Sequence, residues 1–186
     1  HHARLMREAE TEAQPLTIRT RVRVDIDVTE LTIYTQDHPG LFSRVAGAIS
    51  AVDANIVDAK AFTTPSGMAL ETFWLQDNNG SALSASGTLA KLTVQIERAL
   101  AGQMKRSEPH TQHTFIPERI KIFKVPPRVI VNNQASATHT VIEINGRDRP
   151  GFLYLVTGAL FTLSLQISSA KISSFGERAV DVFYVK

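Results

Sequence analysis

The sequence predicts an α+β protein made of two tandem units, each an antiparallel sheet with its helices on one face. The first observation behind this prediction is an internal repeat: residues 37–76 and 148–186 align without a gap from Asp37/Asp148 to Thr63/Ser174. The second is an acid-x-Pro-Gly turn that opens each copy. The third is the order of segments, in which strand-like alternation gives way to a helix-like apolar period and then returns.

The repeat continues beyond Thr63/Ser174 once one residue of the following turn is dropped. Ala69 then aligns with Ala179, Glu71 with Asp181 and Phe73 with Phe183. We interpret the matched acids as charges on a strand face. Repeated units often bind ligands at matching turns or at the seam between them, so the duplication also indicates where a ligand site lies.

Composition excludes several classes of protein. The 186 residues include no cysteine, which rules out disulfides, thiolate metal sites and cysteine catalysis and fits a reducing cytoplasm. No apolar run approaches the ~20 residues of a membrane span, and the polar N-terminus does not resemble a signal peptide. A formal charge of +2 gives no reason to expect nucleic-acid binding. His1-His2 is either native or the remnant of a tag.

Residues 1–28 are predicted to be a lead-in and a strand from an upstream domain. Within them, residues 17–28 alternate, with one apolar and one charged side. The apolar side consists of Ile18, Val22, Val24, Ile26 and Val28. The charged side, with Arg19, Arg21 and Arg23, is interpreted as a solvated strand face in preference to a phosphate site.

Residues 29–132 are predicted to form the first unit. A strand over Leu31–Gln36 precedes a helix with an apolar stripe, and a hairpin and a second helix follow. The later segments are Ile56–Thr63, Met68–Gln76, Thr88–Leu100, Arg119–Val125 and Arg128–Val131. The order strand–helix–strand–strand–helix–strand is typical of the ferredoxin-like fold.

Residues 137–186 are predicted to form the second unit, which starts with a strand over Thr138–Asn145. It repeats strand, helix, strand and strand, without a second helix or a fourth strand. We therefore expect a fragment with an incomplete sheet that exposes apolar surface unless something covers it. Gly47 and Gly158 occupy the same place in the two first helices, which indicates close backbone approach to a neighbour.

Motifs for catalysis are missing from the sequence. It has no glycine-rich phosphate loop, no G-x-S-x-G nucleophile elbow and no His-Asp pair of metal phosphohydrolases. We predict no catalytic residue, no metal site and no cofactor for this chain. His110-x-x-His113 has a spacing suited to a metal, but its polar connector favours a loop.

The two acid-x-Pro-Gly turns are the strongest candidate site. Proline suits the first turn of a helix, and glycine lets a ligand approach the backbone. Free amides at a helix start attract a carboxylate, while the acid of the turn, Asp37 or Asp148, accepts bonds from an ammonium group. The head group of a free α-amino acid carries both charges. The alternative is that the acid only caps the helix.

These residues resemble a known family. The D-x-P-G-[LF] turns, the small residues Gly47 and Gly158 and the Asn55-Ile56 strand start are similar to ACT domains, which sense ligands in amino-acid metabolism and adopt a βαββαβ fold. The runs DHPGLFSRVAGAIS and DRPGFL, with the hairpins that follow, resemble the tandem C-terminal ACT domains of bacterial bifunctional uridylyltransferase/uridylyl-removing enzymes.

The resemblance implies a regulatory role. It implies glutamine as effector, the PII nitrogen-signalling protein as substrate of the parent enzyme, an ACT-mediated homodimer and a cytoplasmic location. Magnesium is implied only for the parent's upstream nucleotidyltransferase and HD domains. The effector-binding residues that it implies are Asp37, His38, Gly40, Leu41, Phe42, Asn55, Ile56, Asp148, Arg149, Gly151, Phe152, Leu153, Gln166 and Ile167.

Two other interpretations stay open at this point. The tandem units could form a dimerisation or docking module, or they could sense an amino acid for another metabolic enzyme. RNA recognition uses the same sheet topology but needs aromatic residues that these strands lack.

Overall fold

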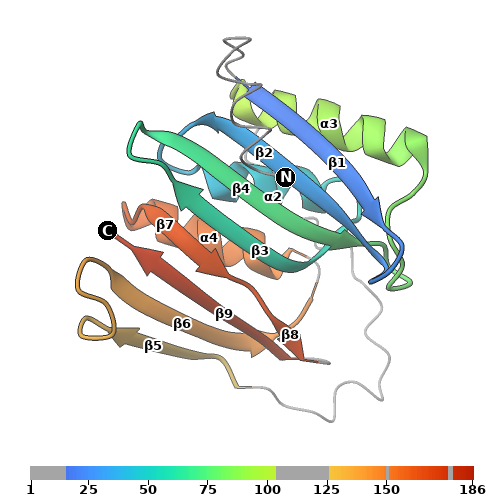
Figure 1. Cartoon of the computed structure of the whole chain (residues 1–186). Helices are drawn as coiled ribbons and strands as arrows, with labels where there is room; N and C mark the ends of the chain where they lie inside the picture. Colours follow the sequence, from blue (N-terminus) through green and yellow to red (C-terminus); the bar gives the residue numbers. More distant parts are fainter. Residues whose placement is uncertain (1–15, 104–125, 150, 176–177) are drawn as a thin grey trace.

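The computed structural model describes residues 16–103, 126–149, 151–175 and 178–186. They form two antiparallel sheets with helices packed on them, so the predicted α+β fold of two tandem units is confirmed (Figure 1). None of the described helices is long and apolar enough to cross a membrane.

The first unit contains four strands and two helices. Its sheet has the order β1-β2-β4-β3, with the helices α2 and α3 on one face (Figure 1). The elements are β1 (Leu16–Arg23), β2 (Val28–Gln36), α2 (Leu41–Ser50), β3 (Asn55–Thr63), β4 (Met68–Gln76) and α3 (Ser86–Leu100).

The strand β1 corrects one expectation from the sequence. It pairs with β2 from Leu16↔Thr35 to Arg23↔Val28, so it forms an edge of the first sheet and does not belong to a separate upstream domain. It also ends at Arg23, not at residue 28. Val24 and Ile26 lie in the following turn and are largely exposed, because the chain reverses there through a left-handed residue, Asp27, at φ 51°.

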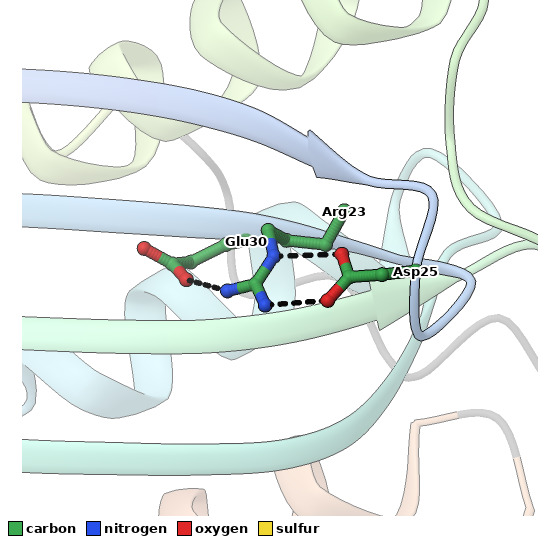
Figure 2. A network of polar contacts seen from close by, with 3 residues as sticks. All are labelled: Arg23, Asp25 and Glu30. Atoms are coloured by element: carbon green, nitrogen blue, oxygen red, sulfur yellow. Dashed lines mark hydrogen bonds and ion pairs between the residues drawn. The ribbon is translucent and has the colours of Figure 1, made fainter.

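One cation on the charged side of this hairpin, Arg23, is paired locally. The Nε and Nη2 atoms of Arg23 donate to the two carboxylate oxygens of Asp25 at 3.0 and 2.7 Å, and the third nitrogen, Nη1, lies 3.9 Å from a Glu30 oxygen (Figure 2). Because Arg23 already pairs with these two acids, its contacts agree with the interpretation of a solvated strand face and not with a phosphate site.

The second unit repeats the same order of strands around one helix. Its sheet has the order β5-β6-β9-β7, with the short β8 paired to β9. The elements are β5 (Arg128–Asn132), β6 (Thr140–Arg147), α4 (Phe152–Thr162), β7 (Ile167–Lys171), β8 (Ser174–Phe175) and β9 (Arg178–Val185).

The strand β5 corrects a second expectation. Residues 128–131 were predicted to close the first unit, but β5 pairs with β6 from Arg128↔Asn145 to Asn132↔Val141. It takes the outer place that β1 takes in the first sheet. The second unit therefore does have a fourth strand, which comes first in the chain, before β6. The strand predicted over 119–125 lies outside the described residues.

The second sheet does expose apolar surface, as predicted. Val129 and Val131 are each 60% exposed although they pair with Ile144 and Ile142, which face the core. In the first unit α3 covers the corresponding region, and the described part of the second unit has no counterpart of α3.

The two units pack against each other along a seam formed by α2 with α4 and by β3 with β7 (Figure 1). One hydrophobic cluster continues through the seam, from Val45 and Phe73 to Leu160 and Phe183. A Cβ added to Gly47 would lie 2.8 Å from the ring of Tyr154 on α4. The close approach predicted for Gly47 is therefore confirmed, and its neighbour is the other unit.

The seam is roughly symmetric. Gly40 of the first turn faces the ring of Phe161 near the end of α4, and Gly151 of the second turn faces Ser50 at the end of α2. Ser50 and Phe161 occupy equivalent positions in the repeat. Each turn thus lies against the helix end of the other unit, which places both turns at the seam.

We predict that Gly47→Ala destabilises the pair of units. The extra methyl group meets Tyr154, and overpacking of ~1–3 kcal/mol outweighs the ~1 kcal/mol that alanine contributes to a helix. Denaturant unfolding should show a free energy of unfolding lower by about 1–2 kcal/mol. Gly87→Ala in α3 is the matched control, because a Cβ there has no neighbour within 4 Å. Equal effects of the two substitutions would contradict the close seam.

Candidate functional site

The turn between β2 and α2 directs the Asp37 carboxylate away from its own helix. Gly40 is the N-cap of α2, at φ 82°, and no side chain caps that helix. The Oδ2 atom of Asp37 instead accepts hydrogen bonds from Thr63 Oγ1 at 2.8 Å and from Gln166 Nε2 at 3.1 Å. The capping alternative is therefore wrong for Asp37, whose carboxylate faces β3 and the second unit.

The start of α2 keeps backbone donors available. The Leu41 amide donates to the His38 carbonyl at 3.1 Å, and the Arg44 amide donates to the Gly40 carbonyl at 3.0 Å. Between them, the amides of Phe42 and Ser43 have no acceptor within the described part of the chain. Such amides, at the positive end of the helix dipole, form a site for an anionic group.

A small cavity lies beside this turn, with a volume of about 20 Å³. That is room for about one water molecule. Residues of both units line it: Asp37, His38, Gly40, Leu41, Phe42, Ser43 and Glu71 from the first, and Thr157, Phe161, Leu165, Gln166 and Ile167 from the second.

The structure brings together half of the site residues that the resemblance implied. Asp37, His38, Gly40, Leu41 and Phe42 of the first turn share the cavity with Gln166 and Ile167 from the start of β7. The pairing is crossed, since the turn of one unit meets the strand start of the other. The seam explains this, because it sets each turn against the opposite unit.

The other implied residues do not line this cavity. The Asn55 side-chain amide donates to the Asp77 carbonyl at 3.3 Å, within its own unit. Leu153 is buried in the core, and Phe152 covers Gly146, where a Cβ would lie 2.7 Å from the ring. The other implied residues outside the cavity are Ile56, Asp148, Arg149 and Gly151.

A wider groove lies next to the cavity along β3 and β7, with a volume of about 480 Å³. Thr63 and Gln166 line the groove, and both are hydrogen-bonded to Asp37 of the cavity. These three side chains therefore separate the two spaces. The main chain of Gln166 is fixed by reciprocal hydrogen bonds with the main chain of Lys186 at 2.9 and 3.0 Å, whereas its side chain is held by the bond to Asp37.

Glu71 is a residue of the site that sequence reasoning missed. It lies on the core face of β4, paired with Ile33 and Ala61, and it is only 3% exposed. Its Oε2 atom has no hydrogen-bond partner among the described residues. Burial, and secondly the nearby charge of Asp37, raises the pKa of Glu71 to about 8.

Asp181 repeats this arrangement in the second unit. It is 1% exposed, and neither carboxyl oxygen has a hydrogen-bond partner in the described ranges. Burial, and secondly the charge of Asp148, raises the pKa of Asp181 to about 7. The interpretation of these acids as charges on a strand face is wrong, because both are buried and their pKa values are raised. Ala69 and Phe73 share the alternation of Glu71, and that signal could have placed it in the core.

Metal binding has no visible basis in the described ranges. No cluster of three or more His, Cys, Asp or Glu side chains there is arranged to hold an ion. The His110-x-x-His113 pair lies outside the described residues.

Fold and cavity together define a class: two ACT-like units in tandem, with a small cavity at their seam. No protein-family model matches the chain. It is 53% identical over 192 residues to the bifunctional uridylyltransferase/uridylyl-removing enzyme of Azospirillum brasilense, in an alignment that covers 99% of this chain and 20% of that protein. The same enzyme from Rhodospirillum rubrum is 48% identical and that from Gluconobacter oxydans 46%, with the same 20% covered.

The predicted resemblance is therefore confirmed: this chain belongs to the family of bifunctional uridylyltransferase/uridylyl-removing enzymes and corresponds to one region of them. It spans about a fifth of the length of the curated relatives it matches. A solved structure, the aspartate kinase from Synechocystis, resembles it distantly, with a TM-score of 0.43 and 12% identity over 86% of this chain and 24% of the kinase.

The two buried acids predict a specific pH dependence of stability. The folded state holds a proton on Glu71 from the ordinary pKa of 4.5 up to about 8, while the unfolded state loses it. The free energy of unfolding should therefore fall as pH rises through this window, by at most ~1.4 kcal/mol per pH unit, and level off above it. Asp181 adds the same trend up to about pH 7.

Glu71→Gln should remove the part of this slope between pH 7 and 8, as measured by denaturant unfolding at each pH. Asp181→Asn is the control, because its contribution ends near pH 7. A slope that survives in the glutamine variant would mean that Glu71 is ionised in the folded protein.

Proposed function

We propose that this chain is the glutamine-sensing region of a bifunctional enzyme that adds uridylyl groups to the PII signalling protein and removes them. The observation that carries the proposal is the cavity at the seam. There the Asp37 carboxylate of one unit accepts a hydrogen bond from Gln166 of the other, and the amides of Phe42 and Ser43 in the same turn have no acceptor among the described residues. The relatives, named as uridylyltransferase/uridylyl-removing enzymes, agree with this role.

The polar groups of the cavity suit a free amino acid. Asp37 accepts the α-ammonium group, and the amides of Phe42 and Ser43 donate to the α-carboxylate. Because the cavity holds only about one water, the Gln166 side chain leaves Asp37 when the ligand enters. The ligand then reaches into the groove, whose polar lining by Ser168 and Ser169 suits a side-chain amide.

Binding of this kind transmits a signal through the seam. The ligand replaces a hydrogen bond that joins the two units, so it favours one arrangement of the units over another. Upstream catalytic domains, with their magnesium ions, would respond in the cytoplasm: glutamine favours removal of UMP from PII, and its absence favours addition. In this scheme the signal passes between the two repeats of one chain. A homodimer of such chains is compatible with it.

We predict that Asp37→Asn weakens glutamine binding by about 10- to 100-fold in isothermal titration calorimetry. The substitution removes the negative partner of the ammonium group, and hydrogen bonds to charged groups contribute ~1.5–3 kcal/mol. The introduced amide keeps an oxygen that accepts from Thr63, so the fold is retained. Asp53→Asn, in the turn after α2, is the matched control and should bind as wild type. The absence of any heat with wild type at millimolar glutamine would refute the sensor.

The exposed valines of β5 favour docking as a second function of the second unit. Val129→Thr combined with Val131→Thr should reduce self-association, if this face forms a dimer, and leave glutamine affinity within about twofold. Sedimentation velocity and calorimetry measure the two properties separately. Gly40→Val should weaken glutamine binding and leave self-association unchanged. Gly40 belongs to the ligand site, where its φ of 82° and its contact with Phe161 exclude a larger side chain. Loss of both properties in either variant would contradict two separate surfaces.

A further inference from the structure

Glu71 is a buried acid that the proposed binding scheme does not yet use. It lines the same cavity as Asp37, and its buried Oε2 atom has no hydrogen-bond partner in the described structure. An ionised carboxylate in a residue that is 3% exposed, with a buried oxygen that has no partner among the described residues, would be very costly, whereas the neutral acid is tolerated. Without a ligand, the site therefore contains the charged acid Asp37 and the neutral acid Glu71.

No cation in the described residues balances these two acids. Asp37 is the charged group whose field reaches Glu71. His38 lines the cavity, Arg44 on α2 is exposed, and α4 offers only the phenol of Tyr154. The charged groups of the neighbouring strands lie on the opposite face of the sheet or outside the cavity: Glu30, Asp58, Lys60, which sits over the Trp74 ring, and Lys171.

The second unit repeats the pair of acids. Asp181 stands where Glu71 stands, and the acid whose charge acts on it is Asp148, the counterpart of Asp37. Both pairs thus combine an acid of the turn with a buried acid of the central strand. A site with two acids and no cation of its own among the described residues is chemically suited to a ligand that brings one.

We propose that Glu71 is the second acid of the ligand site, protonated while the site is empty and ionised when an ammonium group settles between it and Asp37. The inference rests on the proposed function and specifies its ligand class: a cation-bearing zwitterion, not a neutral amide or a simple anion. The proton of the Glu71 carboxyl passes to solvent as the ligand enters, so charge and protons balance.

Proton release makes affinity depend on pH in a defined direction. Because burial and Asp37 raise the pKa of Glu71 to about 8, ligand binding below that pH must expel the proton. The dissociation constant should fall about eightfold from pH 6.5 to 7.5 and level off above pH 8. At pH 7.5 about three quarters of a proton should leave for each ligand bound.

Calorimetry with glutamine measures this directly. The 186-residue chain is titrated at pH 7.5 in phosphate and in Tris, whose ionisation enthalpies differ, and the difference in heat gives the protons released. Wild type should release about three quarters of a proton and Glu71→Gln none. Asp58→Asn is the matched control, since burial also raises the pKa of Asp58 but its side chain is on the other face.

A measurement on the unsubstituted protein guards against a variant that fails to fold. The ¹³C signal of the Glu71 carboxyl should move from its protonated to its ionised position when glutamine is added at pH 7. Heat of binding without buffer dependence, or a carboxyl signal that does not move, overturns this inference and leaves the sensor intact. No binding by wild type in either buffer overturns the proposed function and this inference together.

Discussion

The close packing of α2 on α4 is the constraint on which the rest of the structure depends. Gly47 permits it, because its missing side chain leaves room for the Tyr154 ring. With the helices this close, each acid-x-Pro-Gly turn lies against the helix end of the other unit, and β3 runs beside β7. The cavity exists only because of this arrangement, since five of its lining residues come from the second unit.

The buried acids of the two units oppose stability. Glu71 and Asp181 occupy positions of the core alternation where an apolar side chain would contribute ~1.5–3 kcal/mol. Acids with raised pKa values cluster at functional sites, and structures accept such costs mainly where a ligand or a reaction needs the group. Both units contain the acid pair, with glutamate in one and aspartate in the other. The carboxyl group is therefore present in both units, on side chains of different length.

The two units differ at the residue that crosses the seam. Gln166 reaches Asp37, whereas its counterpart Asn55 binds the carbonyl of Asp77 in its own unit. Asparagine is shorter by one methylene group, and the turn at Asp77 leads to α3, an element with no counterpart in the described second unit. The two potential sites are therefore unequal, and the cavity described here belongs to the first turn.

Much of the fold and part of the site were set by local sequence pattern. Periodicity and the repeated turns predicted the strands, the helices and the α+β class, because each depends on residues close in the chain. They also identified Asp37 and Gly40. The strands β1 and β5, which the sequence analysis assigned to the wrong units, show the limit of such patterns. The alternation of a strand defines its two faces but not its partner strand. Assignment to a sheet required the observed pairing with β2 and β6.

Tertiary structure alone decided which residues meet. The contact of Asp37 with Gln166 spans 129 positions of the chain, and no spacing rule relates them. Burial decided the character of Glu71, which resembles a surface charge until its neighbours Ile33 and Ala61 are known to enclose it. The sequence by itself determined the elements and their turns, because these arise from local geometry; packing at the seam decided the cavity, because a site shared by two units exists only once they have docked.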